Sequence, residues 1–226
     1  MKVSIEPKSL IAEFFGTFML VLFGCGASVV DYGYGNIIGH LGCSMVWGVV
    51  VMAMVYSVGN VSGAHLNPAV TIGFIFARKM DLRIASLYII TQFAGSFVAS
   101  FLLRLAFPES LTLGETIPSV TNLLAFIIEM VLTFILMFVV LNVSTGHMEK
   151  GIMAGVAVGG TVFISALVGG PLTGASMNPA RSLGPAVFSG KMSEIFIYLI
   201  APVLGAVIAS PLCKVIQGDE CCNVES

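Results

Sequence analysis

Residues 62–73 read Ser-Gly-Ala-His-Leu-Asn-Pro-Ala-Val-Thr-Ile-Gly, and residues 173–184 read Thr-Gly-Ala-Ser-Met-Asn-Pro-Ala-Arg-Ser-Leu-Gly. In both stretches a loop of small residues leads into Asn-Pro-Ala. Asparagine is a favoured helix N-cap, and proline suits the first helical position because its missing N–H would have no partner there. Each stretch therefore predicts a loop that opens a helix, one at Asn67 and one at Asn178.

The first of these helices is predicted to be short. After Asn67 the apolar run reaches the polar pair Arg78-Lys79, so the helix has about 12 residues and a length of ~18 Å. The hydrocarbon core of a membrane is ~30 Å thick. A helix of this length cannot cross it alone. Two such helices that enter from opposite faces and meet at their asparagines can cross it together.

The composition indicates an integral membrane protein with one domain. Of 226 residues, 57% are hydrophobic and only 10% are charged, with a mean hydropathy of +1.01, whereas a soluble domain has about 25% charged residues. The net charge of −2 gives no basic face for nucleic acid. We expect no metal site, no cofactor and no disulfide framework, because the five cysteines lack zinc-site spacing and are odd in number. They are expected to be free thiols: Cys25, Cys43, Cys213, Cys221 and Cys222.

Six long apolar segments have lengths that suit transmembrane helices. The Asn-Pro-Ala stretches lie between the second and third segments and between the fifth and sixth. The predicted fold is therefore an all-α membrane protein with six transmembrane helices and two half-helices. The six segments are residues 10–30, 41–58, 84–107, 123–143, 152–168 and 195–216.

The two halves of the chain repeat each other. Glu13 and Glu129 occupy matching places in the first and fourth segments, and Asn67 matches Asn178. Each half holds three crossings, and an odd number makes the second half start on the opposite side of the membrane. The repeats are therefore predicted to be inverted. The predicted division of the single domain 1–226 is repeat one over about 8–107, a connection over 108–121, and repeat two over 122–217.

The basic residues predict the orientation. If the N-terminus is cytoplasmic, seven basic residues fall on the cytoplasmic side and three fall outside or in the pore. The positive-inside rule then favours cytoplasmic N- and C-termini, in a plasma membrane or a bacterial inner membrane. The seven are Lys2, Lys8, Arg78, Lys79, Arg83, Lys150 and Lys214, against Arg104, Arg181 and Lys191.

These features resemble the aquaporin, or major intrinsic protein, family. The resemblance covers nearly the whole chain: six spans, inverted halves, a glutamate in the first span of each half, and two Asn-Pro-Ala boxes in phase with the repeat. It implies a right-handed bundle of six spanning helices with two half-helices. It also implies a homotetramer in the lipid bilayer, with one passive pore in each subunit.

The resemblance also implies four residues of a selectivity filter. Arg181 stands where the family has its constriction arginine, and Trp47, Ala166 and Ala175 stand at the other three filter positions. None of the five cysteines stands at these positions. Taken alone, a tryptophan is more often an anchor at the membrane interface and an arginine is more often on a surface. The filter pattern is most similar to the nodulin-26-like subfamily and its bacterial relatives, which conduct water, glycerol and small metalloid hydroxides.

Two further residues resemble those of water channels instead. Ser182 follows the constriction arginine, where bacterial glycerol facilitators have aspartate, and Ala186 takes the place of a basic residue. The pattern at the filter and the pattern after Arg181 therefore favour different solutes, and a water-selective pore stays open as the alternative.

The Asn-Pro-Ala boxes are predicted to form the midpoint of the pore. The asparagine oxygen can cap its helix, which leaves the amide NH₂ to donate to a passing oxygen atom. Irregular backbone at this depth is tolerated where it lines a cavity, so carbonyl groups of both loops are expected to accept hydrogen bonds along the path. The boxes are Asn67, Pro68, Ala69, Asn178, Pro179 and Ala180; the carbonyls are those of Gly63, Ala64, His65, Gly174, Ala175 and Ser176.

Glu13 and Glu129 lie within apolar segments, and a carboxylate inside a membrane is costly. They could form a proton relay or could hold the backbone N–H groups of the two loops. We favour loop anchoring, because the two residues recur with the repeat and no second titratable group stands beside either in the sequence.

The favoured function is a passive channel for water and small neutral solutes such as glycerol, or metalloid hydroxides, that excludes protons and ions. A secondary transporter is an alternative, because inverted repeats and broken helices also serve that class. Transport coupled to an ion needs ionisable groups at the midplane, and the only carboxylates there follow the repeat. A cation channel is disfavoured by Arg181 and by the positive ends of two half-helices. No nucleophile–base pair indicates an enzyme.

Overall fold

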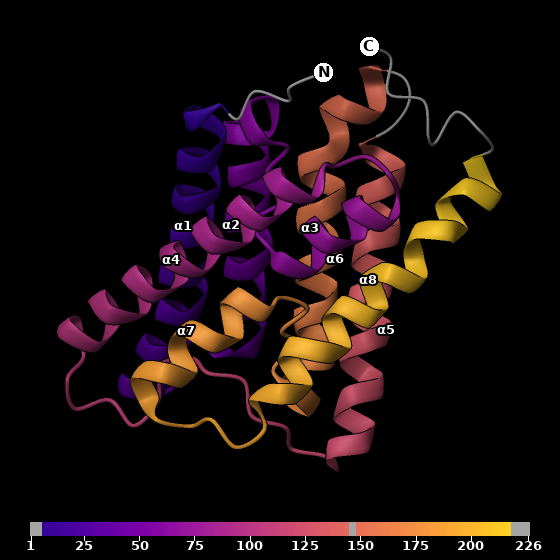
Figure 1. Ribbon diagram of the computed structural model, residues 1–226. Coiled ribbons are helices and arrows are strands. Elements are labelled where there is room, and N and C mark those ends of the chain that lie inside the picture. Colours follow the sequence, from indigo (N-terminus) through magenta and orange to yellow (C-terminus); the bar gives the residue numbers. More distant parts are fainter. Residues whose placement is uncertain (1–5, 145–147, 218–226) are drawn as a thin grey trace.

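Six long helices in the described chain are apolar enough to cross a membrane. The structure is a computed structural model that describes residues 6–144 and 148–217, and no strand occurs in these ranges. The predicted all-α membrane fold is confirmed (Figure 1). Lys2, Cys221 and Cys222 lie outside the described residues. The long helices are α1 (Pro7–Gly33), α2 (Gly39–Ser62), α4 (Leu82–Ala106), α5 (Asn122–Val143), α6 (Met148–Thr173) and α8 (Ile195–Gln217).

Two short helices, α3 (Pro68–Phe76) and α7 (Pro179–Ser189), begin directly after the two asparagines. The Asn67 side chain accepts a hydrogen bond from the N–H of Ala69 at 2.8 Å. The Asn178 side chain accepts one from the N–H of Ala180 at 3.0 Å. Asparagine therefore caps both helices, as the sequence predicts. In Figure 1, α3 lies in the upper half of the bundle and α7 in the lower half.

The short helix α3 has nine residues, so the predicted length of about 12 is wrong. The chain leaves the helix at Ala77, and Arg78 adopts a left-handed conformation with φ 59°. The backbone N–H of Arg78 then bonds to the carbonyl of Ile75, and that of Lys79 bonds to the carbonyl of Phe74. These bonds satisfy the last carbonyls of the helix and end it before the polar pair.

The two halves pack in the same way but run in opposite directions. In Figure 1, α1 begins at the top of the bundle and α5 begins at the bottom. A Cβ atom added to Gly95 of α4 would lie 2.3 Å from the carbonyl oxygen of Phe14. A Cβ atom added to Gly205 of α8 would lie 2.2 Å from the carbonyl oxygen of Met130. Equivalent glycines thus bring equivalent helix backbones together, which confirms the inverted repeat.

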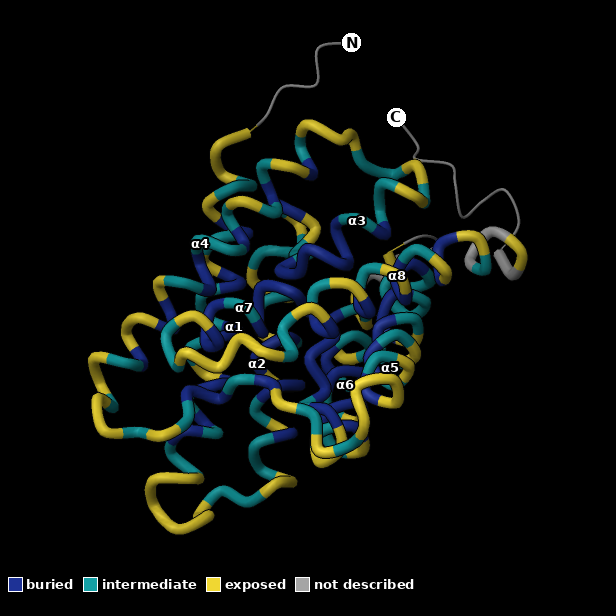
Figure 2. The backbone as a smooth tube through the Cα atoms, turned by 60° about the horizontal axis from the view of Figure 1, so that its bottom comes forward, coloured by how far each residue is buried: buried dark blue, intermediate teal, exposed yellow. Residues whose placement is uncertain are grey.

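Burial separates the middle of the bundle from its outside. Figure 2 shows the dark blue, buried backbone concentrated in the interior, with exposed segments at the ends and outer faces. Most of α3 and α7 is buried. The long helices carry large apolar side chains that are exposed on the outside, as a lipid environment requires: among them are Ile11, Ile90, Ile164, Ile200 and Ile208.

The connection between the halves is held down by a buried carboxylate. The Glu115 side chain is 1% exposed and forms an ion pair with Lys191 at 2.5 Å. It also accepts a hydrogen bond from the N–H of Leu113 at 2.6 Å. Lys191 follows α7 and donates a second bond to the carbonyl of Leu111 at 3.0 Å. Burial disfavours the charged carboxylate, but the hydrogen bonds from Lys191 and Leu113 lower the pKa of Glu115 below its ordinary value.

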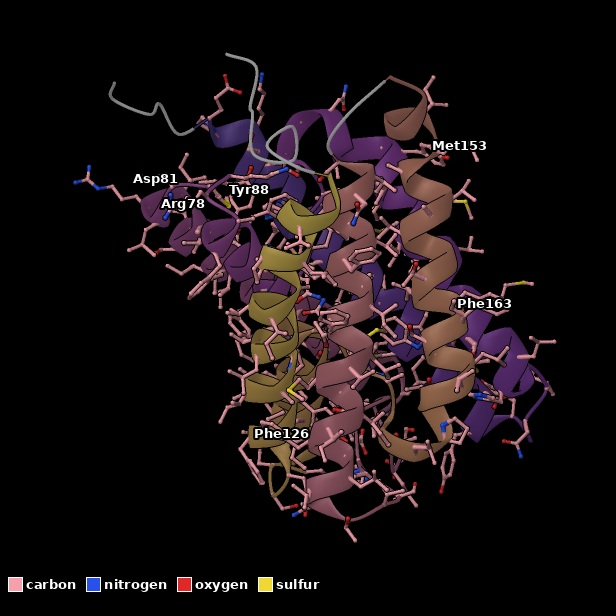
Figure 3. All side chains as sticks on the ribbon, turned by 90° about the vertical axis from the view of Figure 1, so that its right-hand side faces the viewer. Arg78, Asp81, Tyr88, Phe126, Met153 and Phe163 are labelled. Carbon is pink, nitrogen blue, oxygen red and sulfur yellow. The ribbon has the colours of Figure 1, made fainter. Side chains whose placement is uncertain are left out.

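Polar residues mark the end of the bundle where α1 begins. Figure 3 places Arg78 and Asp81 near this end. Asp81 caps α4, because its side chain accepts the backbone N–H of Arg83 at 2.8 Å. At the first turn of α1, Lys8 pairs with Glu6 at 2.9 Å. Several of the basic residues that predict the orientation, among them Lys8, Arg78 and Arg83, therefore lie at one end of the bundle.

The close contact at Gly205 yields a prediction about stability. Gly205→Ala must separate α8 from α5, because the contacted atom is a backbone oxygen that cannot rotate away. We expect a loss of about 1–3 kcal/mol in the free energy of unfolding. Gly160→Ala is the matched control, since nothing lies within 4 Å of its Cβ position. Thermal unfolding in detergent, followed by the fluorescence of Trp47, measures both. Equal melting temperatures for the two variants would contradict the prediction.

The ion pair at Glu115 yields a prediction about pH. A carboxylate whose pKa is lowered by folding contributes stability above its unfolded pKa, and this contribution is lost as the pH falls through the folded pKa. The ordinary pKa of the group is 4.5. We therefore expect the melting temperature of Glu115→Gln to be lower than that of the wild type at pH ~7, and the difference to shrink below pH ~4. Glu109→Gln, an exposed residue of the same connection, is the control. A difference that does not change with pH would count against the ion pair.

Candidate pore

A long cavity runs through the middle of the bundle. It has about 880 Å³ of empty space, including space that is open to solvent. On α6 its walls extend from Ala154 to Ala166, and twelve residues of helix span ~18 Å. Asn67 and Asn178 also line it. The cavity therefore extends past the N-termini of both short helices.

The two asparagines join the halves of the chain at the middle of the cavity. The Asn67 Nδ2 donates to the carbonyl of Met177 at 2.7 Å, and the Asn178 Nδ2 donates to the carbonyl of Leu66 at 2.8 Å. Each side-chain amide has two N–H groups. One of them is engaged with the opposite loop, so only one remains for a molecule in the cavity. The sequence did not indicate these bonds between the two loops.

Glu13 holds the first loop from behind. Its Oε1 accepts the N–H of His65 at 2.9 Å and the hydroxyl of Ser62 at 2.7 Å, and its Oε2 accepts the N–H of Leu66 at 2.7 Å. The loop is strained, since Ala64 and Leu66 have φ of 47° and 51°, and such left-handed residues cost of order 1–3 kcal/mol each. The carboxylate bonds to the backbone within this strained stretch and stabilises its shape.

Glu129 makes the equivalent contacts in the second loop. It accepts the N–H of Ser176 at 2.9 Å, the N–H of Met177 at 2.8 Å and the hydroxyl of Thr173 at 2.7 Å. Ala175 and Met177 have φ of 42° and 54°. The same strain therefore occurs at matching places in both loops. In the described chain, the donors to Glu13 and Glu129 are backbone N–H groups, hydroxyls and one side-chain amide, which is the geometry of loop anchoring.

Residues of both loops line the cavity, with one exception among those expected. Among the residues expected to supply carbonyls, Gly63, Ala64, His65, Ala175 and Ser176 line the cavity. Gly174 does not line it, because it packs against Thr116, whose side chain lies 3.0 Å from the position of an added Cβ. Two further residues of the loops, Leu66 and Met177, also line the cavity and were not predicted from the sequence. They directly precede the two asparagines, and their apolar side chains did not mark them as residues of a polar path.

The four residues expected at the filter come together along the cavity wall. Trp47, Ala166, Ala175 and Arg181 all line it. The guanidinium carbon of Arg181 lies 4.5 Å from the centre of the Trp47 ring, within range of a cation–π interaction. Both residues are buried, at 5% exposure for Arg181 and 9% for Trp47. This end of the cavity therefore has an aromatic wall beside a cation, and two small alanines.

The connection between the halves positions Arg181. The Arg181 Nη1 donates to the carbonyl of Gly114 at 2.7 Å and lies 3.9 Å from the sulfur of Cys25. The Cys25 thiol donates to the same carbonyl at 3.6 Å. Glu115 and Thr116, the next two residues of the connection, fix it in place. Glu115 pairs with Lys191, and Thr116 donates to the hydroxyl of Ser182 at 2.8 Å.

Cys25 was not expected near the filter. It lies behind Arg181, is fully buried and does not line the cavity. Neither Gly114 nor Cys25 belongs to an Asn-Pro-Ala stretch. Sequence spacing could not reveal them, because 156 residues separate Cys25 from Arg181 and 67 separate Gly114 from it.

Comparisons with known proteins agree with this architecture. The family model described as "Major intrinsic protein" matches residues 2–212. Nodulin-26 of Glycine max is 44% identical over 211 residues, which are 93% of this chain and 78% of the relative. The putative aquaporin NIP4-1 of Arabidopsis thaliana is 46% identical over 203 residues, which are 88% of this chain and 71% of the relative.

A solved structure shares the fold. The aquaglyceroporin from Plasmodium falciparum superposes with a TM-score of 0.82 at 28% identity, and the match covers 93% of this chain and 98% of that one. Members of this family are membrane channels and not enzymes. The match of the family model over almost the whole chain, together with the relatives above 40% identity, establishes that this protein belongs to the major intrinsic protein family.

Proposed function

We propose that the cavity is a passive pore for water and small neutral solutes of glycerol size, and that it excludes protons and ions. One observation carries this proposal: the cavity passes between two capped helix N-termini and continues to an arginine beside an aromatic wall. The remaining N–H groups of Asn67 and Asn178 can donate to an oxygen atom at the midpoint. Loop carbonyls can accept from its hydroxyl groups.

Many of the other residues that line the cavity are apolar. Along the cavity, Val51, Val162 and Leu136 face the same space as the two asparagines. A polyol has hydroxyl groups and a carbon backbone, so it matches a path with both polar and apolar lining. Water uses the polar lining alone. At the filter, Ala166 and Ala175 leave room beside Trp47 that larger side chains would fill.

Charge exclusion follows from three positive groups. The N-termini of α3 and α7 meet at the middle, and each helix end carries about half a positive charge. Arg181 adds a full charge farther along the same cavity. Half-helix dipoles and a pore arginine are the established exclusion device of aquaporin-type pores, and this chain has the groups that the device needs.

The surroundings of the pore are part of the proposal. Arg78 and Lys8 lie toward the end of the bundle where α1 begins, so the positive-inside rule favours that end as cytoplasmic. The Arg181 filter then faces the outside. We also propose a homotetramer in a plasma membrane or a bacterial inner membrane, with the single domain 1–226 divided into two repeats by the connection 108–121. The exposed apolar faces of the long helices suit both lipid and neighbouring subunits.

A flux assay tests the pore and its solute together. Purified protein in liposomes is challenged in a stopped-flow instrument with gradients of sorbitol, glycerol and urea, and light scattering reports the change in volume. We expect fast water efflux with sorbitol and fast re-swelling with glycerol. Water efflux without glycerol entry would support the water-selective alternative. A flux that needs an ion gradient would support a secondary transporter.

Charge exclusion gives the first functional prediction. In planar bilayers, the wild type is expected to carry no proton or potassium current above a protein-free bilayer. Arg181→Ala removes the full charge and leaves only the helix dipoles, so we expect water flux to persist and a small proton conductance to appear. Wild-type current above the protein-free level would refute this account of the filter.

The width of the filter gives the second functional prediction. Ala166→His adds volume and a polar group beside Trp47 and Arg181. It should lower glycerol flux several-fold more than water flux, because the loss of each polar contact to a hydroxyl group costs about 1 kcal/mol. The control is Ala154→Ser, a small change at the other end of the cavity. Equal reductions of both fluxes in Ala166→His would show that this position does not select by size.

A further inference from the structure

The indole ring of Trp47 lies directly against the backbone of α1 at Gly24. A Cβ atom added to Gly24 would lie 2.4 Å from Cε3, 2.4 Å from Cζ3 and 2.5 Å from Cη2 of the ring. Real Cβ atoms do not approach other atoms this closely. Gly24 has an ordinary helical conformation and is buried in the middle of α1, so its backbone does not need glycine. The absence of a side chain is what this place requires.

The other surroundings of the ring leave two directions in which it can move, into the cavity and toward Arg181. The guanidinium group of Arg181 stands over the ring, and the ring also borders the cavity. The backbone next to Trp47 is fixed, because Gly48 packs against Phe163 of α6 and against the carbonyl of Gly159. A side chain at position 24 would therefore displace the ring into the cavity or toward Arg181, and either movement narrows the filter.

The second repeat supplies a comparison within the same molecule. Glu13 and Glu129 are 116 residues apart and make matching bonds, so position 140 corresponds to Gly24. Ser62 and Thr173 are 111 residues apart and make matching bonds, so position 158 corresponds to Trp47. Val140 and Val158 occupy these positions, and both line the cavity. The first repeat thus pairs tryptophan, which has the largest side chain, with glycine, which has none. The second repeat has two valines of medium size at the matching positions.

We propose that Gly24 is a specificity-determining residue of the pore, which sets the width of the filter by allowing Trp47 to lie flat against α1. Gly24 does not line the cavity and does not touch the solute. Gly24 affects the solute only by setting the position of the Trp47 ring. This inference rests on the proposed function for its effect on solutes, whereas the position of the ring can be measured without any flux.

The test uses the full chain and three variants. Gly24→Ala adds the methyl group under the ring. Gly26→Ala is the matched control on the same helix, because its Cβ would meet only Leu103 at an ordinary 3.4 Å. Gly24→Ala combined with Trp47→Leu removes the ring, and is compared with Trp47→Leu alone. For each variant, stopped-flow scattering gives the ratio of glycerol flux to water flux. Acrylamide quenching reports the exposure of Trp47, the only tryptophan, in each variant that keeps it.

We expect Gly24→Ala to lower the ratio of glycerol flux to water flux roughly three- to tenfold, since overpacking on this scale displaces side chains. Its Trp47 should also become more accessible to acrylamide, as the ring enters the water-filled cavity. Gly26→Ala should match the wild type in both measurements. The double variant should have the same ratio as Trp47→Leu alone. If Gly24→Ala does not fold but the double variant does, the collision with the ring is again supported.

Three results would overturn the proposal. Gly24→Ala could match Gly26→Ala in both flux ratio and quenching. Gly24→Ala could lower the ratio of glycerol flux to water flux by the same factor in the Trp47→Leu background. The effect would then come from helix packing and not from the ring. Gly24→Ala could fail to fold with and without the ring. A wild type that conducts no glycerol would refute the proposed solute but not the contact between Gly24 and Trp47. Acrylamide quenching of Gly24→Ala, compared with that of Gly26→Ala, would still decide whether the methyl group moves the ring.

Discussion

The bonds from two buried carboxylates to two strained loops are the interaction on which the rest of the structure depends. A loop inside a membrane exposes N–H groups that water cannot satisfy, and each unsatisfied group costs several kcal/mol. Glu13 and Glu129 each accept two such N–H groups and one hydroxyl of their own loop. The loops can then keep left-handed residues and place the asparagines at the middle of the bundle. Without this support neither short helix would have a fixed starting point.

Much of the fold could be predicted from the sequence because its determinants are local or repeat. Asn67 and Asn178 cap helices through atoms two residues away, and the glutamates recur with the repeat, so both could be recognised in the linear chain. The limits of α3 could not be predicted, since its end depends on the left-handed turn at Arg78 and not on polarity. The partners of Arg181 could not be predicted from the sequence either. Gly114 and Cys25 reach it only after the connection folds back over α7 and α1.

The two repeats differ at the proposed filter. The first repeat contributes Trp47 and its support at Gly24, and the second contributes Arg181, Ala166 and Ala175. The connection between the repeats adds the carbonyl that holds the arginine. Symmetry therefore governs the scaffold and the midpoint, where matching groups make matching bonds. The proposed selection depends on the residues that break the symmetry, so the solute is harder to infer from the repeat pattern than the fold is.

The crossed bonds at the asparagines also constrain how the protein folds. Asn67 donates to the carbonyl of Met177, and Asn178 donates to the carbonyl of Leu66, across 110 and 112 residues. During synthesis, the first loop must wait for more than a hundred further residues before its midpoint bonds can form. Contacts of such sequence separation are slow to form. The first half therefore reaches its final geometry only after the second half has been inserted, and any step that delays α7 leaves an incomplete loop in the membrane.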